Sequence, residues 1–314
     1  MRTRGWLARA LVAVSVAVVL TACTSEPDTK DQSEETSAPP SGPCEVAPED
    51  GDVIHSITVG GEERQYRLFA PEGLPTDTRV PVVYLFHGLG QNPEDAVKYT
   101  AFDKAADEHG FIVVAPLGGD EGPGWDIAST VNAKGSDLGF VKALTDAVVE
   151  RHCADPERQY AAGMSNGSAL LFAAACSGDF PFAAYGGVAY LTYGPGCDTV
   201  PPTSFIYFHG SSDVAVPYTG GATPLGVAEP VTETLSAWVT KDECGDPQDY
   251  EEPAADIQHW TWGCADDARI EAFVVLGGGH TWPGATGVGG QGQTTTSIQA
   301  TVEMVRFFGL ADQG

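Results

Sequence analysis

A lone serine, Ser165, stands between two glycines in the segment GMSNG, residues 163–167. The segment RQYAAG leading into it is typical of a buried strand, and the segment NGSALLFAAAC after it of an apolar helix. A serine in a sharp strand-to-helix turn holds its hydroxyl clear of the backbone, and the N–H groups at the helix start favour a developing oxyanion. This context makes Ser165 a candidate nucleophile; the alternative is a structural serine in a tight turn.

A serine hydroxyl is unreactive at neutral pH and needs a base that is itself held by an acid. Asp213 follows the apolar segment TSFIYFHG, and His280 follows the apolar segment IEAFVVLGGG. Both therefore lie just past a strand, in the order serine, acid, histidine, at the sheet edge where open α/β proteins place their sites. The alternatives are an exposed turn carboxylate for Asp213 and a structural loop histidine for His280. Asp198 is a poorer acid because it precedes its strand.

Two backbone N–H groups are expected to form an oxyanion hole. One is the N–H of Asn166, directly after the serine, and the other is the N–H of Leu89 in the loop HGLG after the strand VPVVYLF. His87 begins this loop, but it precedes the serine in the chain. We therefore interpret His87 as shaping the loop and not as the catalytic base.

Strands and helices alternate from residue 53 onward, which predicts an α/β protein with a single mostly parallel sheet and helices on both faces, the α/β-hydrolase fold. The first two strands read as a hairpin. Helices are expected over 94–110, over 137–152 with Ser136 or Asp137 as the cap, over 166–176, near 229–240 and near 296–308. No second folded domain is expected within 44–314.

The first 22 residues carry three arginines and then a short apolar run, typical of a secretory signal peptide. The run ends in LTAC, which resembles a bacterial lipobox, so Cys23 is the expected lipidation site; the alternative is an ordinary signal peptide with a chance cysteine. Residues 23–43 have a composition typical of a disordered tether. The sequence thus predicts an exported lipoprotein at the cell surface, or one released to the medium.

The chain has 16 Lys plus Arg against 43 Asp plus Glu, a formal net charge of −27. This charge disfavours nucleic acid and anionic lipid headgroups as partners, so membrane contact is expected only through the N-terminal lipid. We expect an ester substrate as partner, a monomer, and no cofactor or metal. The segment GVGGQG, residues 287–292, matches a dinucleotide-binding pattern but lacks its strand and acidic residue, and we interpret it as a mobile loop beside the cleft.

The motifs HGLG, GMSNG, HGSSDVAVPY and GGGHTWPG together resemble those of secreted polyhydroxybutyrate depolymerase-like esterases, which are close to feruloyl and acetylxylan esterases. The resemblance covers residues 53–308 and implies the same triad of Ser165, Asp213 and His280. It also implies substrate-binding roles for Trp125 and Trp282, for which the alternative is aromatic packing. Ser168 stands where the family usually has a glycine in the elbow, and Leu117 where an acidic residue is common, which leaves substrate preference open.

Six cysteines remain if Cys23 is lipidated, and an even number in an exported chain favours disulfides. The expected fold brings the helix ends near Cys153 and Cys176 to the edge opposite the site, which predicts Cys153–Cys176. The same edge predicts Cys244–Cys264, and Cys44–Cys197 remains by elimination.

These observations predict a serine carboxylic-ester hydrolase acting outside the cytoplasm. Feruloyl or acetyl esters of polysaccharide fragments, or short hydroxyalkanoate oligomers, are the expected substrates, because the chain leaves no room for a separate polymer-binding domain. The alternatives are a polyhydroxybutyrate depolymerase proper, a peptidase or lipase on the same triad, and a catalytically silent polysaccharide-binding surface lipoprotein.

Overall fold

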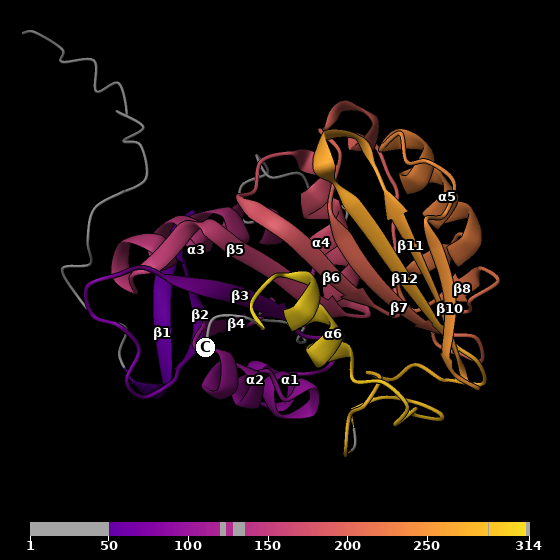
Figure 1. Ribbon diagram of the computed structural model, residues 1–314. Helices are drawn as coiled ribbons and strands as arrows, with labels where there is room; N and C mark the ends of the chain where they lie inside the picture. The colour runs from indigo at the N-terminus through magenta and orange to yellow at the C-terminus, as the bar shows by residue number, and fades with distance from the viewer. Residues whose placement is uncertain (1–49, 120–123, 128–135, 288, 312–314) are drawn as a thin grey trace, which may run out of the picture. The chain divides into compact units, whose positions relative to one another are not determined.

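The computed structural model describes residues 50–119, 124–127, 136–287 and 289–311. These residues form a ten-stranded sheet in which the central strands are parallel and both edges are antiparallel (Figure 1). The spatial order is β1 (Gly51–Val59), β2 (Glu62–Ala70), β4 (Ile112–Pro116), β3 (Val80–Phe86), β5 (Ala154–Met164), β6 (Phe182–Val188), β7 (Phe205–Gly210), β12 (Arg269–Val275), β11 (Ile257–Gly263) and β10 (Asp249–Ala254).

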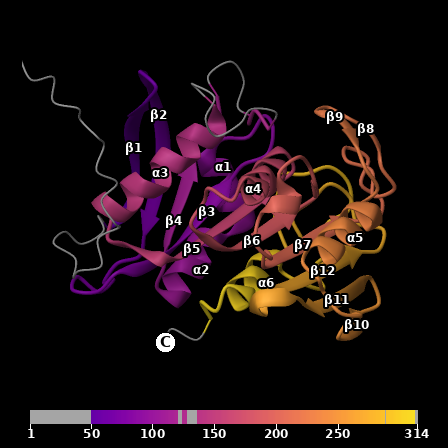
Figure 2. The ribbon, with the colours of Figure 1, turned by 90° about the horizontal axis from the view of Figure 1, so that it is seen from above.

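Helices cover both faces of this sheet (Figure 2). One face packs against α3 (Asp137–Arg151), α4 (Asn166–Ser177) and α5 (Val231–Lys241). The other packs against α1 (Pro93–Thr100), α2 (Phe102–His109) and α6 (Ala300–Phe307). The predicted single mostly parallel sheet with helices on both faces is confirmed. None of the helices within the described ranges has the length and apolar character needed to span a bilayer.

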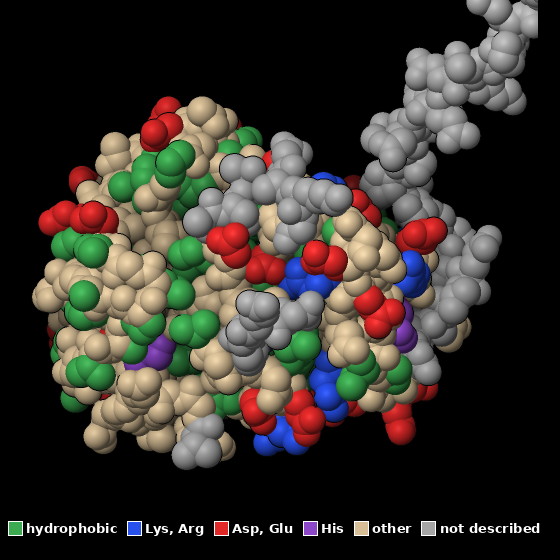
Figure 3. All heavy atoms as spheres, turned by 180° about the vertical axis from the view of Figure 1, so that it is seen from behind, with side chains coloured by type: hydrophobic (Ala, Val, Ile, Leu, Met, Phe, Trp, Pro, Cys, Tyr) green, Lys and Arg blue, Asp and Glu red, His purple; other side chains and the backbone are tan. Residues whose placement is uncertain are grey.

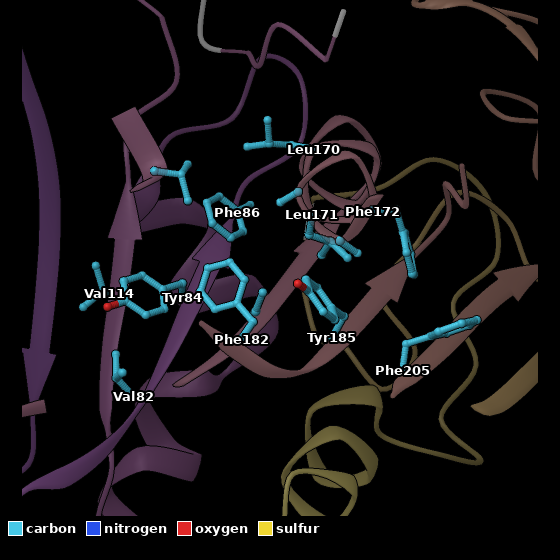
Figure 4. Packing of buried hydrophobic residues seen from close by; sticks show 14 of the residues in the cluster. Val82, Tyr84, Phe86, Val114, Leu170, Leu171, Phe172, Phe182, Tyr185 and Phe205 are labelled. Carbon is cyan, nitrogen blue, oxygen red and sulfur yellow. The ribbon is translucent and has the colours of Figure 1, made fainter. Parts of the chain in front are cut away.

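Strand β3 shows why the central strands read as continuous apolar runs. All seven of its residues are buried, and they alternate between the two helical layers. Tyr84 and Phe86 join the layer of α3 and α4, whereas Val83 and Leu85 join the layer of α1 and α2. Figure 4 shows the first of these layers, where Phe86 packs near Leu170 and Leu171 of α4. Side chains of a strand point alternately to opposite faces, so burial on both faces requires an apolar residue at every position.

The helix predicted over 94–110 is instead two helices. Ala101 has a left-handed backbone, with φ 58°, and its N–H closes α1 by donating to the carbonyl of Val97. The chain turns there so that Phe102, at the start of α2, is fully buried in the second layer. By contrast the predicted cap of α3 is confirmed for Ser136, whose Oγ accepts the N–H of Gly139.

Strand β6 was not predicted, because its sequence FAAYGGV is poor in β-branched residues. Its two glycines let helices approach from opposite faces. A Cβ on Gly186 would lie 2.7 Å from the sulfur of Met304 in α6. A Cβ on Gly187 would lie 2.5 Å from the ring of Phe172 in α4. The glycines that weaken the strand signal are therefore required by the packing of the layers.

The disulfides correct part of the predicted pairing. Cys176 is bonded to Cys197 and not to Cys153, because the short 3-10 helix Cys197–Thr199 lies directly against the end of α4. A Cβ on the neighbouring Gly196 would lie 2.7 Å from the carbonyl oxygen of Cys176. The predicted pairs Cys153–Cys176 and Cys44–Cys197 are therefore wrong.

The other predicted pair, Cys244–Cys264, is present. Cys153 is also disulfide-bonded. Cys23 and Cys44 lie outside the described residues, as do the predicted signal peptide and tether.

Candidate active site

Ser165 occupies the turn between β5 and α4 in a backbone conformation that L-residues seldom adopt. Its φ is 55° and its ψ is −120°. Such a conformation costs about 1–3 kcal/mol and persists only where the surroundings enforce it. Here the N–H of Ser165 donates to the carbonyl of Val188 at the end of β6, at 2.8 Å. The turn thus has the geometry of a nucleophile elbow, with the side chain carried out of the sheet edge.

The two glycines around the serine are required by close approach. A Cβ on Gly167 would lie 2.2 Å from the carbonyl oxygen of Phe86, at the end of β3. A Cβ on Gly163 would lie 2.8 Å from the carbonyl carbon of Gly167. Helix α4 therefore starts in direct contact with the end of β3, which holds the elbow in place.

Asp213 and His280 form a buried pair at the same edge of the sheet. The Nδ1 of His280 and the Oδ2 of Asp213 are 2.7 Å apart. The other carboxylate oxygen, Oδ1, accepts the N–H groups of Ala215 and Val216, each at 2.8 Å. A carboxylate oxygen only accepts hydrogen bonds, so Nδ1 carries the proton and Nε2 is left as an acceptor.

The backbone of His280 is fixed by the glycine-rich segment that the sequence analysis interpreted as a mobile loop. The N–H of His280 donates to the carbonyl of Gln291 at 2.7 Å, and the N–H of Gln291 donates back at 2.8 Å. A Cβ on Gly290 would lie 2.4 Å from the carbonyl oxygen of His280. This part of the segment is held by paired hydrogen bonds, and it lines the cavity, so its predicted place beside the cleft is confirmed.

A cavity of about 300 Å³ opens at these residues. Ser165 and His280 both line it. Its walls come from the loop after β3, the loop after β7, the hairpin of β8 (Gly221–Thr223) and β9 (Gly226–Ala228), and the glycine-rich segment. The lining residues are Gly88, Leu89, Gln91, Met164, Ser165, Ala215, Val216, Thr223, Pro224, Leu225, His280, Gly289, Gly290 and Gln291. Within the described residues, no Lys, Arg, Asp or Glu lines this cavity.

Among the described residues, the backbone N–H groups of Leu89 and Asn166 have no hydrogen-bond acceptor. Leu89 lines the cavity, and Asn166 directly follows Ser165. A Cβ on Gly88, the residue before Leu89, would lie 3.6 Å from Cβ of Ser165. The loop after β3 and the start of α4 therefore flank the serine, as an oxyanion hole requires.

His87 is buried and holds the loop after β3. Its Nε2 accepts the N–H of Gly118 at 3.0 Å, so the proton is on Nδ1, which donates to the carbonyl of Gly88 at 2.8 Å. Burial is the main cause that lowers the pKa of His87. This neutral imidazole ties two loops together, in agreement with the interpretation that His87 shapes the loop.

Trp125 and Trp282 do not line the cavity, which corrects the predicted substrate-binding roles. Trp125 is 5% exposed; its indole N–H donates to the carbonyl of His87, and its backbone pairs with the side-chain amide of Asn166. Trp282 is 1% exposed, and its indole N–H donates to Thr301. Each indole packs beneath the site with its polar atom satisfied, which is the alternative that the sequence left open.

His209 is a site residue that the sequence analysis missed. Its Nε2 donates to the carbonyl of Val216 at 2.9 Å and lies 3.5 Å from Oδ2 of Asp213, while its Nδ1 accepts the hydroxyl of Tyr207. Burial lowers the pKa of His209 to about 4. It is therefore a neutral group that holds Val216, whose N–H donates to the carboxylate of Asp213. The sequence feature that could have identified His209 is its position at the end of a strand, four residues before Asp213.

Comparisons with known proteins agree with this geometry. Residues 64–214 match the family model described as Esterase PHB depolymerase. NocK of Nocardia uniformis subsp. tsuyamanensis, named as an esterase, is 28% identical over 259 residues, which cover 74% of this chain and 75% of NocK. Feruloyl esterase C of Emericella nidulans is 26% identical over 229 residues, which cover 69% of this chain and 76% of that protein.

A relative that contains further parts is the bifunctional acetylxylan esterase/xylanase XynS20E of Neocallimastix patriciarum. It is 24% identical over 229 residues, covering 70% of this chain and 31% of that protein. The resemblance inferred from the sequence motifs is confirmed by these matches.

Among solved structures, the acetyl xylan esterase from Aspergillus awamori superposes with a TM-score of 0.60 at 17% identity, covering 82% of this chain and 100% of that chain. Identity this low speaks for the fold alone. The α/β-hydrolase fold predicted from the sequence is confirmed.

The contact between α4 and β3 predicts a large effect of Gly167→Ala. A Cβ at 2.2 Å from the carbonyl oxygen of Phe86 must push α4 away from β3 and move the elbow. We expect the free energy of unfolding to fall by about 1–3 kcal/mol and esterase activity to fall by at least about tenfold. Urea unfolding and initial rates check this. Gly194→Ala is the control, because a Cβ there meets nothing within 4 Å; equal effects of the two substitutions would contradict the prediction.

The buried His209 predicts a loss of stability in mild acid. Its pKa falls from the ordinary 6.5 to about 4 on folding, so its contribution is complete above about pH 6.5 and is lost as the pH falls towards 4. The expected loss across this window is about 3 kcal/mol. In His209→Gln the free energy of unfolding should start lower at pH 7.5 and decline less towards pH 4.

His152 provides the matched control for this measurement. Burial also lowers its pKa to about 4, and its partner is the hydroxyl of Tyr66, away from the cavity. His152→Gln should flatten the same stability profile while leaving ester hydrolysis at pH 7.5 unchanged. A parallel decline in wild type and His209→Gln would contradict the assignment.

Proposed function

We propose that the chain is a serine carboxylic-ester hydrolase of the family whose model, Esterase PHB depolymerase, matches residues 64–214. The observation that carries the proposal is the Asp213–His280 pair, 2.7 Å apart, whose histidine lines the same cavity as Ser165. A base oriented by a buried acid beside a serine on a strained elbow is the arrangement that acyl transfer requires.

The proposed reaction begins with attack of Ser165 Oγ on the carbonyl carbon of the ester. Nε2 of His280 accepts the hydroxyl proton as the new C–O bond forms, and Asp213 stabilises the resulting imidazolium through Nδ1–H. The N–H groups of Leu89 and Asn166 then donate to the carbonyl oxygen as it becomes negative. His280 returns the proton to the departing alcohol, which leaves an acyl group on Ser165.

Water completes the proposed cycle. His280 takes a proton from the water, which attacks the acyl carbon, and the proton then passes to Ser165 Oγ as the carboxylic acid departs. His209 holds the carbonyl of Val216, whose N–H binds Asp213, and it exchanges no proton because burial keeps it neutral.

The cavity supports an uncharged ester as substrate. Its lining is apolar on the hairpin side, at Pro224 and Leu225, and contains no cation among the described residues that could pair with a substrate carboxylate. A volume of about 300 Å³ is at the small end of ligand sites and suits an acyl group of one ring or smaller. Relatives named as feruloyl and acetylxylan esterases support feruloyl or acetyl groups on polysaccharide fragments.

The disulfides support action outside the cytoplasm, since such bonds persist in oxidising compartments. We further propose that Cys23 is lipidated and that the domain of residues 44–314 is a monomer carried on the tether of 23–43.

On the face seen in Figure 3, acidic side chains are spread over the surface and basic ones lie beside them. The formal net charge of −27 favours a neutral substrate over a polyanion.

Replacing the nucleophile tests the reaction. Ser165→Ala should lower kcat by at least about 10⁴-fold and abolish labelling by a fluorophosphonate, because the attacking oxygen is gone. Ser168→Ala is the control, since Ser168 is a buried serine in the same helix whose Oγ donates to the carbonyl of Tyr190. Labelling that persists in Ser165→Ala, or an unlabelled wild type, would refute the serine mechanism and favour a binding protein.

A panel of esters tests the substrate class. Feruloyl and acetyl esters of small sugars should be turned over faster than polyhydroxybutyrate film, because they fit a cavity of about 300 Å³. An ester of the same length with a free acyl-side carboxylate should react roughly tenfold slower or worse, since the cavity cannot pair its charge. Faster release of products from the film than from the soluble esters would overturn the proposed class.

A further inference from the structure

The side chain of Gln91 links two segments of the cavity wall that lie 198 residues apart. Its Oε1 accepts the N–H of Gly88 at 2.9 Å, in the loop after β3. Its Nε2 donates to the carbonyl of Gly289 at 2.9 Å, in the glycine-rich segment. Both hydrogen-bonding ends of one amide are therefore used, one on each segment.

The first end helps to fix Gly88, the residue before the Leu89 N–H. The carbonyl of Gly88 and the N–H of Leu89 belong to one planar trans peptide, so they point in opposite directions. That carbonyl is held by the backbone N–H of Gln91 at 3.1 Å and by Nδ1 of His87 at 2.8 Å. Gln91 Oε1 holds the N–H of Gly88, which belongs to the preceding peptide. Both peptides that flank the Cα of Gly88 are therefore held, and this keeps the Leu89 N–H available to an oxyanion.

The second end reaches the segment that fixes the catalytic histidine. Gly289 is two residues before Gln291, whose backbone exchanges two hydrogen bonds with His280. A Cβ on Gly289 would lie 2.5 Å from the ring of Tyr99, so the segment is also packed from outside. Gln91 thus connects the oxyanion loop with the support of the base.

We propose that Gln91 is a positioning residue for the hydrolysis: it holds the Leu89 N–H and the His280 segment in one fixed arrangement. This inference rests on the proposed function. Gln91 itself does not react, because its neutral amide exchanges no proton with the ester; it acts through its bonds to Gly88 and Gly289. Removing the Gln91 side chain should destabilise the transition state more than the bound substrate, because the negative charge on the oxyanion develops in the transition state.

The test uses Gln91→Met, which keeps length and removes both hydrogen bonds, and Gln91→Glu, which keeps the acceptor for Gly88 and loses the donor for Gly289. With a soluble acetyl ester, we expect kcat to fall by about 10- to 100-fold in Gln91→Met, with KM within about twofold. The rate of fluorophosphonate labelling should fall in parallel, because the phosphonyl oxygen uses the same donors. Gln91→Glu should lower kcat less than Gln91→Met but still by more than about twofold, because the bond to Gly289 is lost.

Gln258→Met is the matched control, because Gln258 lies in β11, outside the cavity, and its amide donates to Tyr250. It should leave kcat unchanged. The positioning role is overturned if the kcat of Gln91→Met stays within about twofold of wild type. A rise in KM with kcat unchanged also overturns it and would mean that Gln91 contacts the substrate directly. If Gln91→Met does not fold, the comparison of Gln91→Glu with wild type decides in the same way. A wild type that is neither labelled nor active would instead refute the proposed function.

Discussion

The close contact between the start of helix α4 and the end of strand β3 is the constraint on which the site depends. It exists only because residue 167 is glycine, whose Cβ would otherwise lie 2.2 Å from the carbonyl oxygen of Phe86. With α4 so close, the chain must leave β5 through a very tight turn, and Ser165 takes its positive φ as a consequence. The burial of α4 on nearly all sides offsets this local strain of a few kcal/mol. The same contact places the N–H of Asn166 beside the loop after β3.

The acid and the base meet for a related reason. Strands β7 and β12 are parallel neighbours in register, with Gly210 opposite Val275, so the loops that follow them begin side by side. A Cβ on Gly210 would lie 2.3 Å from the carbonyl oxygen of Gly278, which shows how tightly these loops pack. Asp213 and His280 are therefore brought together by sheet register, although 67 residues separate them.

The sequence could predict the features whose signals are local. Apolar runs marked the central strands, and glycines around Ser165 marked the elbow. Features set by packing between distant segments could not be read. The Cys176–Cys197 bond depends on which loop reaches the end of α4, and Gly186 weakened the signal of β6 for the very reason that Met304 packs against it. Trp125 was predicted to bind substrate because its short motif does not show whether the indole is exposed. In the structure the indole is buried.

Buried histidines at the ends of β3 and β7 make the same kind of hydrogen bonds. A His-Gly pair directly follows β3 at His87–Gly88 and ends β7 at His209–Gly210, and both imidazoles are buried. Each uses one nitrogen as donor and the other as acceptor, and burial lowers the pKa of each, so each stays neutral with a single tautomer. A neutral imidazole can hold a carbonyl and a donor at once, which neither a lysine nor a carboxylate can do. His87 and His209 therefore act as fixed links under the oxyanion loop and the acid, and among these three histidines only His280 faces the cavity.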